Sequence, residues 1–265
     1  MPEPGRVYCG DAIEIMRGWP AQSIDFIFTD PPYGHNNNNG DLISRREEAL
    51  GQGVGTSPRE AFRPIANDGE EANTLVRAFF AEAKRLLKPG CCCCCCCCCC
   101  CCGGGGPDPQ FARWSLWLDE VLDFKQMVIW DKGPMGMGWH YRRSYETVLV
   151  ATKPGAACKW YDESNTVENI LRSGAVPKII PSAEQHPTEK SPRLAKHFIR
   201  LHTLPGDVVL DPFTGSGSTL DAANRLNRRW IGIELAPEFH AMATERMRRA
   251  VILPPEEAAK EGRLF

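Results

Sequence analysis

The chain has 265 residues and a formal net charge of -2, with 31 Lys and Arg against 33 Asp and Glu. This near-neutral balance excludes a uniformly basic nucleic-acid-binding surface but leaves a local one open. Outside the cysteine block the sequence has no run of about 18 apolar residues, and it has no signal-peptide pattern, so no membrane span is expected. The absence of a spaced disulfide framework among the 14 cysteines favours the cytoplasm.

Predicted strands and helices alternate along the chain. Short β-branched or aromatic runs predict strands over residues 6–10, 24–29, 126–131, 145–152, 207–211 and 229–235. Amphipathic patterns predict helices over residues 12–18, 72–88, 109–123, 189–202, 217–227 and 237–250. This alternation is typical of one parallel sheet covered by helices on both faces, and it predicts a single domain over residues 1–265.

Two segments interrupt the alternation. Residues 35–69 are polar and rich in Gly and Asn, which predicts a flexible loop insertion. Residues 155–185 have weak periodicity and mixed charge. Long loops in a compact domain are usually functional or disordered, so both segments are candidate contacts with a partner.

Twelve cysteines run without a break from Cys91 to Cys102, between LLKPG and GGGGPDPQF. Zinc sites space their ligands so that a turn can fold them around one ion, whereas consecutive residues of a strand point to opposite faces. We therefore predict no metal site in this run. A central parallel strand is apolar on both faces and free cysteine is often buried, so about half of the run is expected to form a strand.

The stretch SIDFIFTDPPYGH ends a predicted strand with an acid, two prolines and an aromatic ring. The prolines stop the strand, so Asp30, Pro31, Pro32 and Tyr33 are expected at the carboxyl edge of the sheet, where open α/β sheets bind ligands. The Asp30 carboxylate and the Pro31 carbonyl can accept hydrogen bonds from an exocyclic amine while Tyr33 stacks on the base. A plain strand-ending turn is the alternative that these residues leave open.

A second motif, PGDVVLDPFTGSGSTLDAANRLNRRWIGIEL, combines a strand, a glycine-rich turn, a helix and a second strand that ends in Glu234. Gly215 and Gly217 allow the backbone to approach a ligand closely, and Glu234 can bind the two hydroxyls of a ribose. Asp211 would repel a pyrophosphate at this turn. S-adenosylmethionine, a nucleoside with a positive charge, therefore fits better than a dinucleotide.

The order of these motifs resembles that of the permuted β class of DNA amino-methyltransferases, in which DPPY precedes FxGxG. Segments at residues 10–12, 128–153 and 186–199 resemble further motifs of that family. The resemblance implies a Rossmann-like, seven-stranded, mostly parallel sheet with helices on both faces. It also implies an inserted target-recognition region, for which residues 155–185 are the candidate.

The resemblance further implies an enzyme that acts on double-stranded DNA with S-adenosylmethionine as its cofactor. It implies contacts of Asp11 with the cofactor adenine, and of Thr188 and Lys190 with the methionine carboxylate. The implied catalytic residues are Asp30, Pro31, Pro32 and Tyr33. The implied cofactor site comprises Asp11, Ala12, Asp30, Thr188, Lys190, Asp211, Phe213, Gly215, Gly217 and Glu234.

The implied mechanism begins with a target base that leaves the duplex stack, at a cost on the order of a few kcal/mol. Tyr33 recovers part of that cost by stacking, and Asp30 orients the amine for one in-line methyl transfer. The acid at position 30 favours adenine N6, while cytosine N4 or an RNA base stays as an alternative.

Other interpretations stay open at this level. A non-catalytic, cysteine-rich metal-binding protein is the alternative of a different class. No nuclease motif is apparent, so a solitary or prophage-type enzyme and a restriction-modification enzyme both fit, as do a monomer and a homodimer. Arg142 and Arg143 fit either a DNA contact or a strand edge. Trp114 and Trp117 lie at helical spacing, which favours the core over a base-stacking platform.

Overall fold

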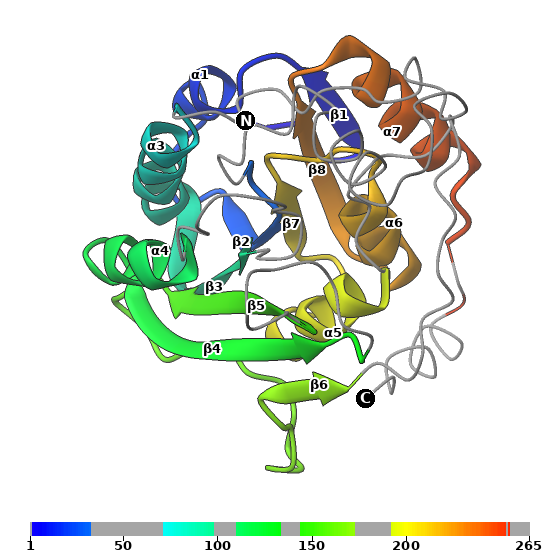
Figure 1. Cartoon of the computed structure of the whole chain (residues 1–265). Coiled ribbons are helices and arrows are strands. Elements are labelled where there is room, and N and C mark those ends of the chain that lie inside the picture. The colour runs from blue at the N-terminus through cyan, green and yellow to red at the C-terminus, as the bar shows by residue number, and fades with distance from the viewer. Residues whose placement is uncertain are drawn as a thin grey trace, which may run out of the picture.

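The computed structural model describes residues 2–32, 71–97, 110–133, 144–172, 192–252 and 254. One eight-stranded sheet forms its centre, with the strand order β1-β8-β7-β2-β3-β5-β4-β6 (Figure 1). The strands are β1 (Arg6–Cys9), β2 (Ile24–Thr29), β3 (Leu87–Cys97), β4 (Asp123–Asp131), β5 (Tyr145–Thr152), β6 (Ile170–Arg172), β7 (Val208–Asp211) and β8 (Arg229–Glu234). All neighbouring strands pair in parallel except β5, which runs antiparallel to β3 and β4.

Helices cover both faces of the sheet (Figure 1). Those on one face are α1 (Ala12–Arg17), α3 (Glu71–Leu86) and α4 (Gln110–Asp119). Those on the other are α5 (Pro192–His202), α6 (Ser218–Arg225) and α7 (Pro237–Arg249). The predicted Rossmann-like, mostly parallel architecture is confirmed. Among the described residues, no helix has the length and apolar character that a membrane span requires.

The prediction of seven strands is wrong by one, because β6 was not expected. This strand has only three residues, of which Leu171 is buried while Ile170 and Arg172 are exposed. It pairs in parallel with β4, where Ile129 lies opposite Ile170. Three residues are too few for the alternation of apolar and polar side chains to distinguish a strand from the surrounding loop.

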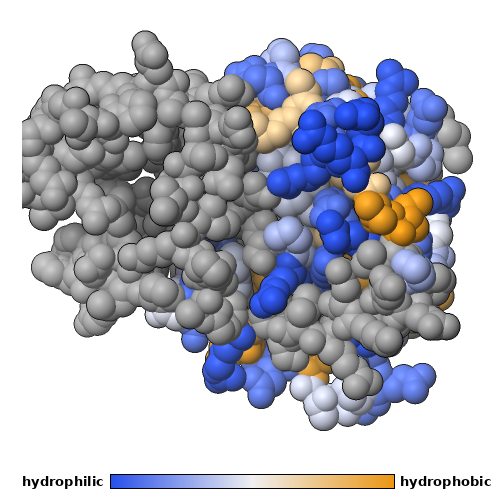
Figure 2. All heavy atoms as spheres, turned by 90° about the vertical axis from the view of Figure 1, so that its right-hand side faces the viewer, coloured by the Kyte–Doolittle hydropathy of each residue, from blue (hydrophilic) through white to orange (hydrophobic). Residues whose placement is uncertain are grey.

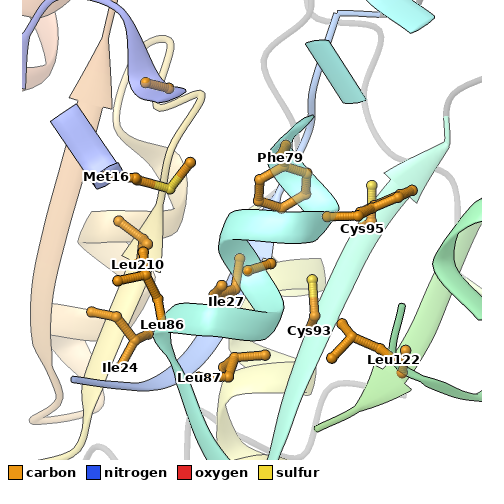
Figure 3. Close-up of a cluster of buried hydrophobic side chains, with 14 of the residues drawn as sticks. Met16, Ile24, Ile27, Phe79, Leu86, Leu87, Cys93, Cys95, Leu122 and Leu210 are labelled. Carbon is orange, nitrogen blue, oxygen red and sulfur yellow. The ribbon is translucent and has the colours of Figure 1, made fainter. Parts of the chain in front are cut away.

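The cysteine run forms part of β3, as predicted, and its described side chains alternate between the two faces of the sheet. The odd-numbered set packs with α1, α3 and α4, and comprises Cys91, Cys93 and Cys95. The even-numbered set packs with α5 and α6, and comprises Cys92, Cys94 and Cys96. Figure 3 shows Cys93 and Cys95 in one cluster with Phe79 and Leu122. The strand is thus buried on both faces; residues 98–102 of the run lie outside the described part of the chain.

The expectation that two tryptophans of α4 belong to the core is confirmed. Trp114 is fully buried against α3, and Trp117 is half-buried at the rim of the same cluster. The guanidinium carbon of Arg77 lies 4.8 Å from the centre of the Trp117 ring. A cation at this distance above the ring face is attracted to the negative face of the aromatic ring.

Among the described residues on the α6 and α7 side of the molecule, those that Figure 2 shows are mainly hydrophilic. Hydrophobic residues in the described part of this view form small, separate groups. Ala243 and Met247 of α7 are buried against the sheet, in a cluster with Val7. The helix therefore turns its apolar side inward, as an amphipathic surface helix does.

We expect Cys93→Ser to lower the free energy of unfolding by about 1 to 3 kcal/mol, because the variant places a hydroxyl in a fully buried apolar cluster. The exposed Cys9 provides the control, and Cys9→Ser should stay within about 0.5 kcal/mol of the parent. Urea unfolding followed by circular dichroism measures both. Equal stability of Cys93→Ser and the parent chain would contradict the assignment of β3 as a buried central strand.

Candidate active site

Four acids that the sequence analysis singled out lie along one edge of the sheet. The parallel strands β1, β8, β7 and β2 are neighbours, so their carboxyl ends meet at that edge. Asp11 and Asp30 follow β1 and β2, while β7 and β8 end in Asp211 and Glu234. The structure thus brings together residues that are more than 200 positions apart in the sequence, at the edge where α/β sheets bind ligands.

The glycine-rich turn after β7 is fastened to the end of β8. The Thr214 amide donates to the carbonyl oxygen of Ile233 at 3.0 Å, and the Gly215 amide donates to Glu234 Oε2 at 2.8 Å. Gly217, which precedes α6, has a φ of 86° and would place a Cβ atom 3.4 Å from Ala243. That distance is an ordinary van der Waals contact, so the left-handed backbone is the reason for glycine at this position.

Glu234 uses both carboxylate oxygens to shape this part of the site. Besides the bond from Gly215, its Oε1 accepts a hydrogen bond from the Ala236 amide at 2.9 Å. Burial raises the pKa of Glu234, and the backbone N–H groups of Ala236 and Gly215 oppose that rise. Each oxygen has a further lone pair, so this carboxylate can still accept hydrogen bonds from two hydroxyl groups.

Asp211 faces the protein interior. Its Oδ1 accepts hydrogen bonds from the Thr29 hydroxyl at 2.7 Å and from the Phe213 amide at 3.2 Å. Burial raises the pKa of Asp211 to about 6, against the lowering effect of hydrogen bonds from Thr29, Thr219 and Phe213. These contacts give Asp211 a positioning role, because they join the end of β2 to the start of the glycine-rich turn.

The turn after β2 carries the predicted catalytic residues. Asp30 is half-buried, Pro31 is buried and Pro32 is half-buried. Thr29, the last residue of β2, holds this turn through its bond to Asp211. Thr29 was not among the predicted residues, although a polar residue that ends the strand IDFIFT was a usable signal.

The remaining predicted cofactor residues lie at the start of α1 and in the glycine-rich turn, or outside the described part of the chain. Asp11 caps α1, because its Oδ1 accepts a hydrogen bond from the Glu14 amide at 2.9 Å, and Ala12 is buried at the start of that helix. Phe213 is half-buried and meets the Phe79 ring edge-on, with 5.6 Å between the ring centres. The predicted residues that lie outside the described part of the chain are Tyr33, Thr188 and Lys190.

Comparisons with known proteins show the family to which this chain belongs. The sequence model of a family described as DNA methylase matches residues 24–245. This match covers most of the chain, which therefore belongs to the DNA methylase family.

Two relatives and a solved structure illustrate the similarity. The DNA adenine methyltransferase YhdJ of Escherichia coli (strain K12) is 25% identical, with 95% of this chain and 85% of that protein covered. The type II methyltransferase M2.DpnII of Streptococcus pneumoniae is also 25% identical, with 89% and 87% covered. The crystal structure of the M1.HpyAVI–SAM complex superposes with a TM-score of 0.60 at 26% identity, covering 91% of this chain and 98% of that one.

The raised pKa of Asp211, about 6, predicts a pH dependence of stability. Between about pH 4, near the pKa of an unfolded Asp, and about pH 6, the folded chain retains a proton that the unfolded chain has lost. The retained proton on Asp211 therefore raises the free energy of unfolding by on the order of 3 kcal/mol below this window. This contribution is lost as the pH rises through the window.

The variant Asp211→Asn cannot ionise, so its free energy of unfolding should change less than that of the parent over this window. Urea titrations of both proteins from pH 4 to pH 7 give the difference between the two profiles. Profiles that run parallel would show that Asp211 ionises with an ordinary pKa.

Proposed function

We propose that this chain transfers a methyl group from S-adenosylmethionine to the N6 amine of adenine in double-stranded DNA. The main support is the 2.7 Å hydrogen bond from Thr29 to Asp211. It holds the turn that begins at Asp30 against the glycine-rich turn after β7, so a carboxylate suited to an amine and a turn suited to a nucleoside share one edge. The family match and the name of the Escherichia coli relative support the same reaction.

The residues at this edge fit a nucleoside that carries no phosphate. Glu234 offers hydrogen-bond acceptors to the ribose hydroxyls, and Asp11 lies at the end of the neighbouring strand β1. Phe213 offers a half-buried ring, and the backbone at Gly215 and Gly217 allows close approach. When bound, S-adenosylmethionine supplies an electrophilic methyl group on a positively charged sulfur, which acidic neighbours favour.

The role of the turn after β2 is to orient the target amine. In this proposal the Asp30 carboxylate and the Pro31 carbonyl accept hydrogen bonds from the two N–H groups of the amine. That arrangement directs the nitrogen lone pair away from them and toward the methyl group, so positioning supplies most of the catalysis. Tyr33 is proposed to stack on the extruded base and offset part of the unstacking cost.

Further proposals concern the surroundings of this reaction. Residues 1–265 are proposed as one domain, with target recognition by residues 155–185 and DNA contacts from Arg142 or Arg143. In the described part of the recognition segment, Trp160 and Tyr161 are 44% and 39% exposed, as aromatic residues at nucleic-acid surfaces often are. We also propose that the protein is cytoplasmic and forms a homodimer. Thr188 and Lys190 are proposed to contact the methionine carboxylate of the cofactor.

The product identifies the substrate directly. DNA from cells that express the chain but lack other methylases is digested to nucleosides and analysed by mass spectrometry. The proposal predicts N6-methyladenine. N4-methylcytosine in its place would shift the substrate to the alternative base, and unmodified DNA despite bound cofactor would overturn the reaction.

We expect Asp30→Ala to lower the methyl-transfer rate by about 100- to 1,000-fold, the usual cost of removing one group that orients or stabilises the reacting atoms. Cofactor affinity should change little, because Asp30 addresses the amine. Tritium transfer from labelled cofactor gives the rate, and calorimetry gives the affinity. A turnover near that of the parent would refute the catalytic assignment.

Glu234→Gln should weaken cofactor binding by roughly 10- to 150-fold, which corresponds to the loss of about 1.5 to 3 kcal/mol for hydrogen bonds to a charged group. Glu238 is an exposed acid at the start of α7 and provides the matched control. Calorimetry on the Glu238→Gln variant should give the affinity of the parent. Equal affinities for the two variants would contradict the role of Glu234.

A further inference from the structure

Three side chains that can bind a metal ion lie together away from the carboxyl edge of the sheet. They are Cys92 in β3, Cys158 after β5, and His202 at the end of α5. Cys92 Sγ lies 3.6 Å from Cys158 Sγ and 3.2 Å from His202 Nδ1. The three ligand atoms all lie within 4.8 Å of one another, so one ion can contact all of them.

A backbone oxygen completes the group of donors. The carbonyl oxygen of Lys159 lies 3.0 Å from His202 Nδ1 and 3.7 Å from Cys158 Sγ. Metal–ligand bonds of about 2.0 to 2.3 Å at tetrahedral angles separate neighbouring donor atoms by roughly 3.4 to 3.8 Å. The four separations here, 3.0 to 3.7 Å, are close to those values, so shifts of a few tenths of an ångström suffice for a tetrahedral site.

The fold orients the imidazole and leaves access to the site. Phe26 stacks on the His202 ring with 5.7 Å between centres, and Trp160 meets the ring edge-on at 5.3 Å. Cys92 and His202 are buried, whereas Cys158 is exposed. A cation can therefore reach the cluster from solvent and then be shielded by the buried ligands.

The two thiols can balance the charge of a cation, because each becomes a thiolate when it binds a metal ion. The neighbouring ammonium group of Lys159 lies 3.4 Å from Asp25 Oδ1, on a carboxylate that also pairs with Lys88 at 2.7 Å.

We propose that Cys92, Cys158 and His202 bind one zinc ion, with the Lys159 carbonyl oxygen as the fourth ligand. Two thiolates and an imidazole in tetrahedral arrangement are typical zinc ligands. Zinc binding releases the thiol protons of Cys92 and Cys158 and requires the His202 proton to reside on Nε2. The ion ties the segment that follows β5 to β3 and α5. The cysteine run contributes one ligand to this zinc site, Cys92. The other ligands come from the segment after β5 and from α5.

Zinc titration of the full-length chain tests the proposal. The protein is kept in reductant, stripped of metal with a chelator, and titrated with zinc chloride in a calorimeter. We expect one zinc ion per chain, and binding at least 10-fold weaker in Cys158→Ser. Cys9→Ser removes another exposed cysteine and should bind like the parent. Cobalt(II) in the parent should give the visible bands of a tetrahedral site and a thiolate charge-transfer band, both lost in Cys158→Ser.

Three results would overturn the proposal. The first is a parent chain that binds no zinc. The second is equal zinc binding by the parent and Cys158→Ser, which would assign the ion to other cysteines. The third is a Cys92–Cys158 disulfide that persists in reductant. Because zinc binding is measured without DNA or S-adenosylmethionine, each result is independent of the proposed methyl transfer.

Discussion

The hydrogen bond between Thr29 and Asp211 joins the two strands on which the active site depends. It requires β2 and β7 to be parallel neighbours that end at the same edge, which the pairing of Phe26 with Val209 and of Ile27 with Leu210 establishes. A buried carboxylate is costly, and the raised pKa of Asp211 reflects that cost. This cost falls at the position where the turn that begins at Asp30 meets the glycine-rich turn after β7.

The rest of the sheet keeps this edge rigid. β2 is buried along its whole length between β7 and β3, so neither the strand nor its turn can shift without disrupting packing on both faces. The described cysteines of β3 pack beside β2 on both faces, with one set on the α3 side and the other on the α5 side. Their small apolar side chains fill both layers, and a sequence with so little variety still forms an ordered central strand.

Much of this arrangement could be predicted from the sequence because it depends on local patterns. Runs such as IDFIFT and RWIGIE identify buried strands, and prolines or glycines mark where they end. The described part of the cysteine run forms a strand, as predicted, since burial on both faces suits an uninterrupted apolar sequence. The match of the chain to the DNA methylase family agrees with the motif order.

Contacts between distant residues could not be predicted in this way. The hydrogen bond that orients Asp211 comes from Thr29, which is 182 positions away, and no local pattern indicates that partner. The cluster of Cys92, Cys158 and His202 joins residues 66 and 110 positions apart, and no spacing rule for metal ligands would find it. Such features follow from tertiary packing, to which a single sequence gives no direct access.

A double-mutant cycle on methyl transfer tests the central claim, that the Thr29–Asp211 bond couples the two turns. Thr29→Val, Asp211→Ala and the double variant are compared with the parent, with circular dichroism to confirm that each is folded. If the bond carries the coupling, the double variant transfers methyl groups about as slowly as the slower single variant. Rate losses that multiply independently would show that each residue acts alone, and would contradict this account.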